Sequence, residues 1–208
     1  MGGAPFSKAA LSLAMQRAPR LVAADSGADR LLALGLKPEA VIGDFDSISA
    51  AAQAALGPER LHPIAEQDTT DFDKALRSIA APFVLALGFD GARMDHGLAV
   101  LNALVRHRDR ACVVVGAKDV VFHVPPALDL ALKVGDRLSL FPMGAVQGWS
   151  EGLRWPIEGL AFAPDTIIGT SNEVSLRQVR LRMGGAGMLA ILPRARLDAV
   201  LSGLLQPV

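Results

Sequence analysis

Residues 20–48 read RLVAADSGADRLLALGLKPEAVIGDFDSI and hold two short apolar runs separated by a segment of helical length. The runs RLVAAD (20–25) and AVIGD (40–44) stay apolar up to a closing aspartate. Continuous apolarity is typical of strands that are covered on both faces, as in a parallel sheet. Between the runs, Ser26 precedes Asp29 by three residues, a spacing that resembles a helix-capping box. The stretch therefore predicts a strand–helix–strand unit.

The same rhythm continues along the first half of the chain. PFVLALG (82–88) and ACVVVG (111–116) are further candidates for buried strands. Thr70 precedes Asp73 by three residues, which again indicates the start of a helix. Alternating strands and helices predict an α/β layer whose parallel strands are joined by right-handed crossovers.

The pattern changes after Pro125-Pro126. Short strand-like pieces follow, separated by glycine and proline: DRLSLFP, AVQGW, LRWPI, EVSLRQVRLRM and GMLAILP. The fourth piece alternates apolar and polar residues with one slip at Arg177-Gln178, which we interpret as a β-bulge. We predict an α/β domain over residues 1–126 and a small antiparallel β domain over residues 127–208.

The composition excludes several classes of protein. The 208 residues are 51% hydrophobic, and 21 basic side chains balance 21 acidic ones, so a broad nucleic-acid-binding face is not expected. We find no apolar run of 18 residues, and the start MGGAPFSKAA lacks the apolar core of a signal peptide. The single cysteine, Cys112, lies in an apolar run and is expected to be buried. We expect a cytoplasmic protein that binds neither nucleic acid nor membrane.

Acidic residues follow the predicted strands. They are Asp25, Asp44, Asp46, Asp68, Asp71, Asp73, Asp90 and Asp95. Ligands of open α/β sheets bind beyond the carboxyl ends of the strands, where these loops would converge. Carboxylates held close together repel each other, and a Mg²⁺ ion relieves this repulsion while it binds substrate phosphates. The pattern therefore predicts a phosphate-transferring site with a metal.

Several of these acids also have plain structural explanations. We favour helix capping for Asp29 and Asp73, and an ion pair along a helix would explain the spacing of Asp71 and Lys74. Asp95 could cap the helix that follows it. The D-x-D spacing is short, arises by chance, and serves several classes of enzyme. The sequence contains neither a P-loop nor a dinucleotide fingerprint.

Taken together, the acidic loops resemble the thiamine pyrophosphokinase (thiamine diphosphokinase) family. The matching motifs, in order, are ADSGADRLL (24–32), PEAVIGDFDSI (38–48), EQDTTDFDKAL (66–76), GFDGARMDHGLAVLNAL (88–104) and GTSNEVS (169–175), together with GLRWPIEG (152–159). The resemblance implies a Rossmann-like domain that binds ATP and Mg²⁺, followed by a β-sandwich domain for thiamine binding and dimerisation. The implied protein is a homodimer that converts ATP and thiamine into AMP and thiamine diphosphate.

The resemblance also implies roles for individual residues. Asp44, Asp46 and Asp71 would hold the metal and, with Lys74, carry the catalysis. Residues assigned to the nucleotide are Asp25, Ser26, Gly27, Arg30, Gln67, Asp68, Thr70, Arg93, Asp95 and His96. Ser171 and Asn172 would contact thiamine.

These residue types suit the chemistry. The hydroxyl of thiamine would attack the β-phosphorus of ATP, and such transfers depend on positioning and charge neutralisation. Lys74, Arg30 and Arg93 would offset the phosphate charge, while Gly27 and Gly91 would let backbone N–H groups approach it.

Thiamine is a cationic aromatic compound, so an aromatic partner would suit it. No aromatic residue follows Phe162, and the chain has no tyrosine. We therefore expect Met183, Met188 or another subunit to provide the apolar wall.

Two other functions remain open at this point. A metal-dependent glycosyl- or nucleotidyltransferase would use Asp44 and Asp46 but leaves the other motifs unexplained. A non-catalytic sensor of nucleotide or thiamine would keep the fold without turnover.

Overall fold

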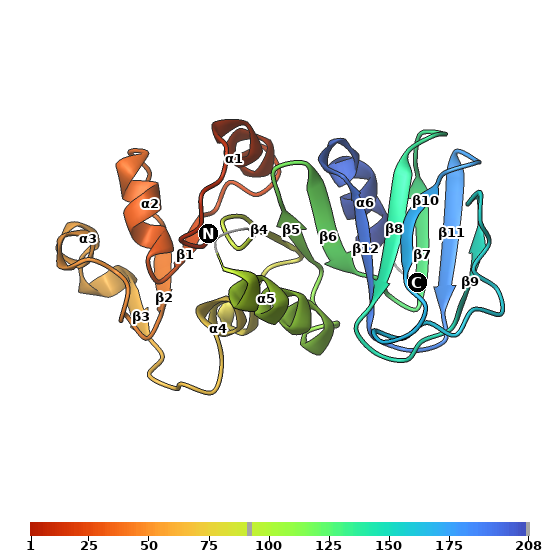
Figure 1. The fold of residues 1–208 in the computed structure, drawn as a ribbon. Coiled ribbons are helices and arrows are strands. Elements are labelled where there is room, and N and C mark those ends of the chain that lie inside the picture. The colour runs from red at the N-terminus through yellow and green to blue at the C-terminus, as the bar shows by residue number, and fades with distance from the viewer. Residues whose placement is uncertain (91–92, 207–208) are drawn as a thin grey trace. The chain divides into compact units, whose positions relative to one another are not determined.

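The computed structural model describes residues 1–90 and 93–206. The chain packs as two compact units, residues 1–103 and residues 104–208 (Figure 1). The helix α5 (Met94–Arg106) contributes to both. Within the described ranges, none of the helices is both long and apolar enough to cross a lipid bilayer. The predicted domain boundary at residue 126 separates two functions, ATP binding and thiamine binding, and it stays a prediction.

The first unit is built around a parallel sheet with the strand order β1-β2-β3. Its strands are β1 (Val22–Ala24), β2 (Ala40–Gly43) and β3 (Leu61–Pro63). The helices are α1 (Lys8–Met15), α2 (Gly27–Ala33), α3 (Ala50–Leu56) and α4 (Asp71–Ser78), with a 3₁₀ turn at Pro58–Arg60 and a further strand, β4 (Val84–Ala86). The predicted strand–helix–strand unit over residues 20–48 is confirmed.

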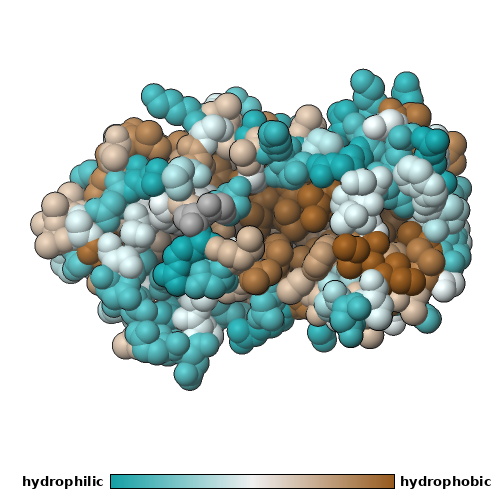
Figure 2. Space-filling view, viewed as in Figure 1, coloured by the Kyte–Doolittle hydropathy of each residue, from teal (hydrophilic) through white to brown (hydrophobic). Residues whose placement is uncertain are grey.

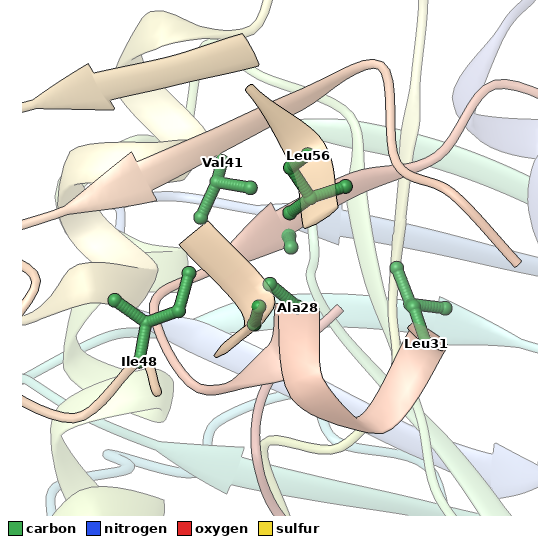
Figure 3. Packing of buried hydrophobic residues seen from close by; sticks show 7 residues of the cluster. Ala28, Leu31, Val41, Ile48 and Leu56 are labelled. Atoms are coloured by element: carbon green, nitrogen blue, oxygen red, sulfur yellow. The ribbon is translucent and has the colours of Figure 1, made fainter. Parts of the chain in front are cut away.

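Both faces of the parallel sheet are covered, as the continuous apolar runs require. Alternate residues of a strand point to opposite faces. Ala23 and Val41 pack with residues from α2 and α3 in one cluster, which Figure 3 shows from close by; its members are Ala23, Ala28, Leu31, Val41, Ile48, Ala52 and Leu56. Ala24 and Ile42 face the other way, onto Ala75 of α4.

The helix starts confirm one capping prediction and correct two. Thr70 accepts a hydrogen bond from the backbone N–H of Asp73, as predicted. Ser26 has a helical backbone conformation and makes no side-chain cap, so the predicted box with Asp29 is wrong. Asp29 accepts hydrogen bonds from the backbone N–H and the hydroxyl of Ser49, the residue that caps α3. Asp95 lies inside the first turn of α5 and therefore does not cap it.

The second unit is rich in antiparallel strands. They are β5 (Cys112–Val115), β6 (Asp119–His123), β7 (Ala127–Ala131), β8 (Arg137–Pro142), β9 (Gly148–Glu151), β10 (Gly169–Glu173), β11 (Gln178–Met183) and β12 (Met188–Pro193). The neighbours β10-β8-β12-β6-β5 form one run and β7-β11-β9 another, and α6 (Leu197–Leu204) follows the 3₁₀ turn Arg194–Arg196. The mixed α/β prediction, with a parallel sheet followed by antiparallel strands, is confirmed at this level.

Two details of the second unit differ from the sequence prediction. The run 111–116, expected in a parallel sheet, forms β5, which pairs antiparallel with β6. The segment 173–183 is not one strand with a bulge: β10 ends at Glu173, and residues 178–183 form β11 in a different sheet. The slip in alternation lies just before β11 begins, and in β11 Val179 and Leu181 are buried on either side of the exposed Arg180.

Candidate active site

Three aspartates meet at the carboxyl ends of β1 and β2. Asp25 follows β1 directly, and Asp44 and Asp46 follow Gly43 at the end of β2. One carboxylate oxygen from each lies within 4.8 Å of the others, an arrangement that could hold a metal ion. The convergence of the first two acidic loops, predicted from parallel pairing, is therefore present in the structure.

The backbone at these aspartates is unusual. Asp25 has a φ of 42° and Phe45 a φ of 65°, in the left-handed region that non-glycine residues rarely adopt. The ring of Phe45 packs against the hydrophobic cluster between the sheet and α2, while the backbone N–H of Asp46 donates to Asp44 Oδ1 at 3.3 Å. Strain of this kind gathers at functional sites, because the surrounding packing must hold it. Here the packing of Phe45 holds this backbone conformation, and with it the positions of Asp44 and Asp46.

Asp25 is the buried member of the trio, with 2% of its surface exposed. Its Oδ2 accepts a hydrogen bond from the backbone N–H of Ser47 at 3.3 Å, whereas its Oδ1 is buried without a hydrogen-bond partner. A buried carboxylate oxygen that lacks a donor is costly, and a cation would satisfy it. Burial is the main cause that raises the pKa of Asp25 to about 6, against the pull of the Ser47 hydrogen bond. These properties fit a ligand of a divalent ion.

Removing the Asp25 charge should change how stability depends on pH. Below pH 4, Asp25 is protonated in both the folded and the unfolded chain, so its contribution is constant. Between pH 4 and about 6 only the unfolded chain loses the proton, so the folded state loses stability as the pH rises. The two-unit difference corresponds to about 3 kcal/mol.

We therefore expect Asp25→Asn to gain stability relative to the original chain as the pH rises from 4 to 7 without divalent cations. Urea unfolding of both proteins at several pH values measures this difference. A difference in unfolding free energy between the two proteins that does not change with pH would contradict the raised pKa of Asp25. Added Mg²⁺ should narrow the gap, because a bound cation stabilises the Asp25 carboxylate.

Lys74 provides the positive charge inside the acidic cluster. Its side chain is 1% exposed, and its ammonium donates to Asp44 Oδ2 at 2.9 Å and to Asp71 Oδ1 at 3.4 Å. The hydrogen bond from Lys74 is the main cause that lowers the pKa of Asp44, while burial above all raises the pKa of Asp71. Lys74 thus contacts two carboxylates, and its contact with phosphates, which the family resemblance implied, stays a prediction. It balances the negative charge of the cluster.

A pocket of about 400 Å³ opens beside these acids, within the first unit. Asp25, Asp44 and Asp71 line it together with Ser47 and the backbone of the N-terminal glycines. The complete lining is Gly2, Gly3, Ala4, Pro5, Ala24, Asp25, Ser26, Asp44, Ser47, Thr69, Thr70, Asp71, Phe72, Gly88, Phe89, Arg93, His96 and Val100. It therefore combines backbone amides, hydroxyls and cationic side chains around the carboxylates, a donor set that suits a metal-bound phosphate chain.

Residues 11–115, more than half of the chain, match the family model described as thiamin pyrophosphokinase, catalytic domain. The chain belongs to the thiamine pyrophosphokinase family. Among curated relatives, thiamine pyrophosphokinase 1 of Oryza sativa subsp. japonica is 27% identical over 203 residues, covering 81% of this chain and 77% of the relative. Thiamin pyrophosphokinase 1 of Caenorhabditis elegans is 28% identical over 171 residues, covering 74% of this chain and 70% of the relative.

The fold agrees with solved members of the thiamine pyrophosphokinase family. The crystal structure of thiamin pyrophosphokinase from Geobacillus thermodenitrificans superposes with a TM-score of 0.75 at 22% identity, covering 95% of this chain and 97% of that one. At this identity the likeness speaks for the fold alone. The resemblance inferred from the acidic motifs is thus confirmed by the family match.

The structure brings several of the family's predicted nucleotide residues to the pocket. Asp25, Ser26, Arg93 and His96 line it directly, as does Thr70, which also caps α4. Arg93 forms an exposed ion pair with Asp95, 2.6 Å between guanidinium nitrogen and carboxylate oxygen, whose hydrogen bond lowers the Asp95 pKa to about 2.

Arg30, Gln67, Gly27 and Asp68, which the resemblance also assigned, are not among the residues that line the pocket. Arg30 donates to the carbonyl of Gly3 at 3.0 Å, and Gln67 donates to Asp44 Oδ2 at 3.3 Å. Gly27 has no room for a side chain, because a Cβ there would collide with the Met1 carbonyl. Asp68 is exposed, and Gly91 lies outside the described residues.

In the second unit, Asn172 forms hydrogen bonds with the backbone of Trp155, a residue to which the sequence analysis gave no role. Asn172 is buried; its Oδ1 accepts from the backbone N–H of Trp155 at 3.2 Å, and its Nδ2 donates to the Trp155 carbonyl at 2.7 Å. The Trp155 ring is beneath the Arg154 guanidinium, 5.0 Å from its centroid, and remains 53% exposed. Met183 and Met188, expected to form an apolar wall, are buried in the core.

Ser171, the other predicted thiamine residue, is exposed and has a φ of 60°. Its backbone N–H donates to the Ser139 hydroxyl at 2.9 Å, which links this irregular part of β10 to β8.

Two features of the sequence point to roles that the resemblance did not assign, for Asp25 as a metal ligand and for Trp155 as an exposed aromatic residue. Asp25 comes directly after β1, and this place matches that of Asp44 after β2, so both are candidates for the same ion. Trp155 lies in GLRWPIEG, an aromatic residue within a motif of the family. The hydrogen bonds between its backbone and Asn172 join residues 17 apart in sequence, so the sequence pattern does not predict them.

Proposed function

We propose that this chain transfers the pyrophosphoryl group of ATP to the hydroxyl of thiamine, giving thiamine diphosphate and AMP. The family match confirms the predicted function and enzyme class, and it does not support the glycosyl- or nucleotidyltransferase alternative. The observation that carries the proposal here is the trio of aspartates beside the pocket, with the orphaned oxygen of Asp25. A site built for a cation fits this reaction.

We propose Mg²⁺ as the ion, held by Asp25, Asp44 and Asp46. Hard divalent cations prefer oxygen ligands, and the trio offers one oxygen from each residue. When bound, Mg²⁺ neutralises charge on the triphosphate and orients its phosphates. Asp71, predicted as a further ligand, forms an ion pair with Lys74 at 3.4 Å. Its role as a ligand stays a prediction.

The chain's own residues would then position the nucleotide. The backbone at Gly2, Gly3 and Gly88 lines the pocket, so N–H groups can approach phosphate oxygens closely. Arg93 and His96 lie on the same pocket and would contact the triphosphate or its ribose. Such positioning, with charge neutralisation, is most of what phosphoryl transfer requires.

We further propose a division of functions between the two parts of the chain. Residues 1–126 would form the Rossmann-like catalytic domain for ATP and Mg²⁺. Residues 127–208 would form a β-sandwich that binds thiamine and builds a homodimer. The second unit has exposed hydrophobic residues, among them Ile167, Ile168 and Leu176, which support an interface there. Figure 2 shows hydrophobic surface, in brown, over that unit. A cytoplasmic location, where ATP is available, completes the proposal.

The test is an assay with ATP, Mg²⁺ and thiamine. We expect AMP and thiamine diphosphate to form in equal amounts, and AMP formation to require thiamine. Formation of ADP, or no AMP from protein whose folding is verified by circular dichroism, would contradict the proposal. Binding of both substrates without turnover would instead favour the sensor.

We propose that Trp155 stacks on thiamine, with Asn172 fixing the tryptophan. An aromatic face attracts a cationic ring by up to about 2 kcal/mol. Trp155→Ala should therefore raise the KM for thiamine roughly 10-fold and leave the KM for ATP unchanged. Trp149→Ala is the matched control, since Trp149 is also exposed in the second unit. Equal changes in both variants would contradict a specific role for Trp155.

A further inference from the structure

A short stretch of backbone, residues 2–5, forms one wall of the pocket beside the aspartate trio. Gly2, Gly3, Ala4 and Pro5 all line that pocket. Together with Phe6 they lie outside the helices and strands and lead towards α1, and we call residues 2–6 the glycine segment. Because the segment has no secondary structure of its own, its contacts with the rest of the first unit decide how its backbone is presented to the pocket.

One side of the glycine segment is held by the residues that follow β4. The Gly2 N–H donates to the carbonyl of Leu87 at 2.8 Å, and the Ala4 N–H donates to the carbonyl of Gly88 at 3.0 Å. Gly88 has a φ of 75°, and a Cβ there would lie 2.6 Å from the Gly2 carbonyl oxygen. The close approach of the two backbones therefore depends on glycine at position 88.

The N–H of Gly3, which lies between these two bonds, is not used in this way. It has no hydrogen-bond partner within residues 1–90 and 93–206, and Gly3 is exposed on the pocket wall. A backbone N–H at a residue without a Cβ can approach a phosphate oxygen closely. The Gly3 N–H is therefore the donor that the glycine segment offers to a phosphate.

The other side of the glycine segment is held by one side chain, that of Arg30. Its Nε donates to the carbonyl of Gly3 at 3.0 Å, and its guanidinium carbon lies 5.8 Å from the centroid of the Phe6 ring. The second distance is within the range of a cation–π contact. Arg30 therefore contacts the segment at two residues, on either side of Ala4 and Pro5.

Arg30 extends from a helix that is firmly packed. Ala28 and Leu31, its neighbours on α2, are completely buried in the cluster against the parallel sheet (Figure 3). The start of α2 also touches the glycine segment, because a Cβ at Gly3 would collide with the hydroxyl of Ser26. The contacts of Arg30 thus tie the segment to the sheet through α2.

We propose that Arg30 is a positioning residue, which fixes the glycine segment so that the Gly3 N–H meets the nucleotide phosphates, and that Arg30 does not contact those phosphates itself. The guanidinium is bonded to the Gly3 carbonyl, and Arg30 is not among the residues that line the pocket. Glycine regains more backbone freedom than any other residue when a contact is lost. Without Arg30, ATP binding would have to order the segment again. This inference rests on the proposed function.

The test uses Arg30→Met in the full chain, which keeps the length of the side chain but removes its donors and its charge. Without ligand, the backbone amide order parameters of Gly3 and Ala4 should fall from about 0.85 towards about 0.6. The KM for ATP should rise roughly 10-fold, because binding must order the segment. The kcat should stay within about 3-fold, since bound ATP has already ordered it, and the KM for thiamine should not change.

Two further variants separate positioning from a direct contact with phosphate. Arg93→Met is the matched control: Arg93 lines the pocket, so the KM for ATP should rise while the order parameters of Gly3 and Ala4 stay the same. Phe6→Ala leaves the charge of Arg30 in place and removes its aromatic partner. It should raise the KM for ATP roughly 3-fold, and the double variant should be no worse than Arg30→Met alone.

Three results would overturn the proposal. They are unchanged order parameters in Arg30→Met, a KM for ATP that Arg30→Met leaves within twofold, and a KM for ATP that does not respond to Phe6→Ala. The order parameters are measured without substrate, so they decide on the positioning of the segment separately from the reaction. Absence of AMP formation by the original chain would contradict the proposed function instead.

Discussion

Replacing Asp46 by asparagine is expected to lower kcat roughly 100-fold or more, with little change in stability. The Asp46 side chain is exposed, and its carboxylate accepts from the Ser47 hydroxyl at 2.6 Å, a bond that asparagine can keep. It is also one of the three oxygens within 4.8 Å, so the substitution removes a charge from the proposed metal centre. Losing one preorganised electrostatic group typically costs a factor of about 100 to 1,000.

Asp29→Asn is the matched control for this prediction. Asp29 accepts from the N–H and hydroxyl of Ser49 and lies outside the aspartate trio. We expect it to lose about 1 kcal/mol in unfolding free energy and to keep kcat within a few-fold. Steady-state AMP formation and urea unfolding of both variants provide the measurements. Equal losses of activity would contradict the assignment of Asp46 to the metal centre and of Asp29 to a structural role.

Lys74→Met is expected to produce the largest loss of stability. Methionine has a similar length but no charge, so Asp44 and Asp71 would lose their shared counter-ion. Removing one partner of a buried ion pair costs about 3–5 kcal/mol, and the partial exposure of Asp71 places this case near the lower end. Urea unfolding without divalent cations measures the loss.

Two comparisons isolate the cause. Added Mg²⁺ should restore part of the lost stability, because a cation at the trio compensates the Asp44 carboxylate. Arg77→Met on the same helix removes a partly exposed cation that pairs with Glu66, 2.7 Å between nitrogen and oxygen, and only at 3.9 Å with Asp73. That control should lose less than about 1 kcal/mol. Similar losses in the two variants, or no effect of Mg²⁺ on Lys74→Met, would argue against charge compensation.

The parts of the fold that follow local rules can be predicted from the sequence. The two apolar runs in residues 20–48 predict parallel strands, and the rule that ligands bind beyond strand ends then brings Asp25, Asp44 and Asp46 to one edge of the sheet. The capping role of Thr70 is also predictable, because it depends on residues three apart.

Features that depend on tertiary pairing cannot be predicted in this way. Asp29 supports a neighbouring helix, since Ser49 comes to it only when α2 and α3 pack on the same face of the sheet. β5 has the apolar pattern of a parallel strand, but burial on both faces does not fix the direction of its neighbour. The bond between Asn172 and Trp155 joins residues 17 apart in sequence. The contact of Lys74 with Asp44 depends on the packing of α4 against the strand that precedes Asp44, and it joins residues 30 apart in sequence.

The loop from Asp44 to Ser49 is fastened at both ends. Phe45 anchors it in the hydrophobic cluster, and Asp29 anchors Ser49 at the start of α3. Ordering a residue costs about 1–2 kcal/mol in backbone entropy. For this loop that entropy is lost when the chain folds, before any ligand arrives. Ligand binding should therefore show little additional loss of conformational entropy here, and the loop's amide order parameters should be nearly the same with and without nucleotide.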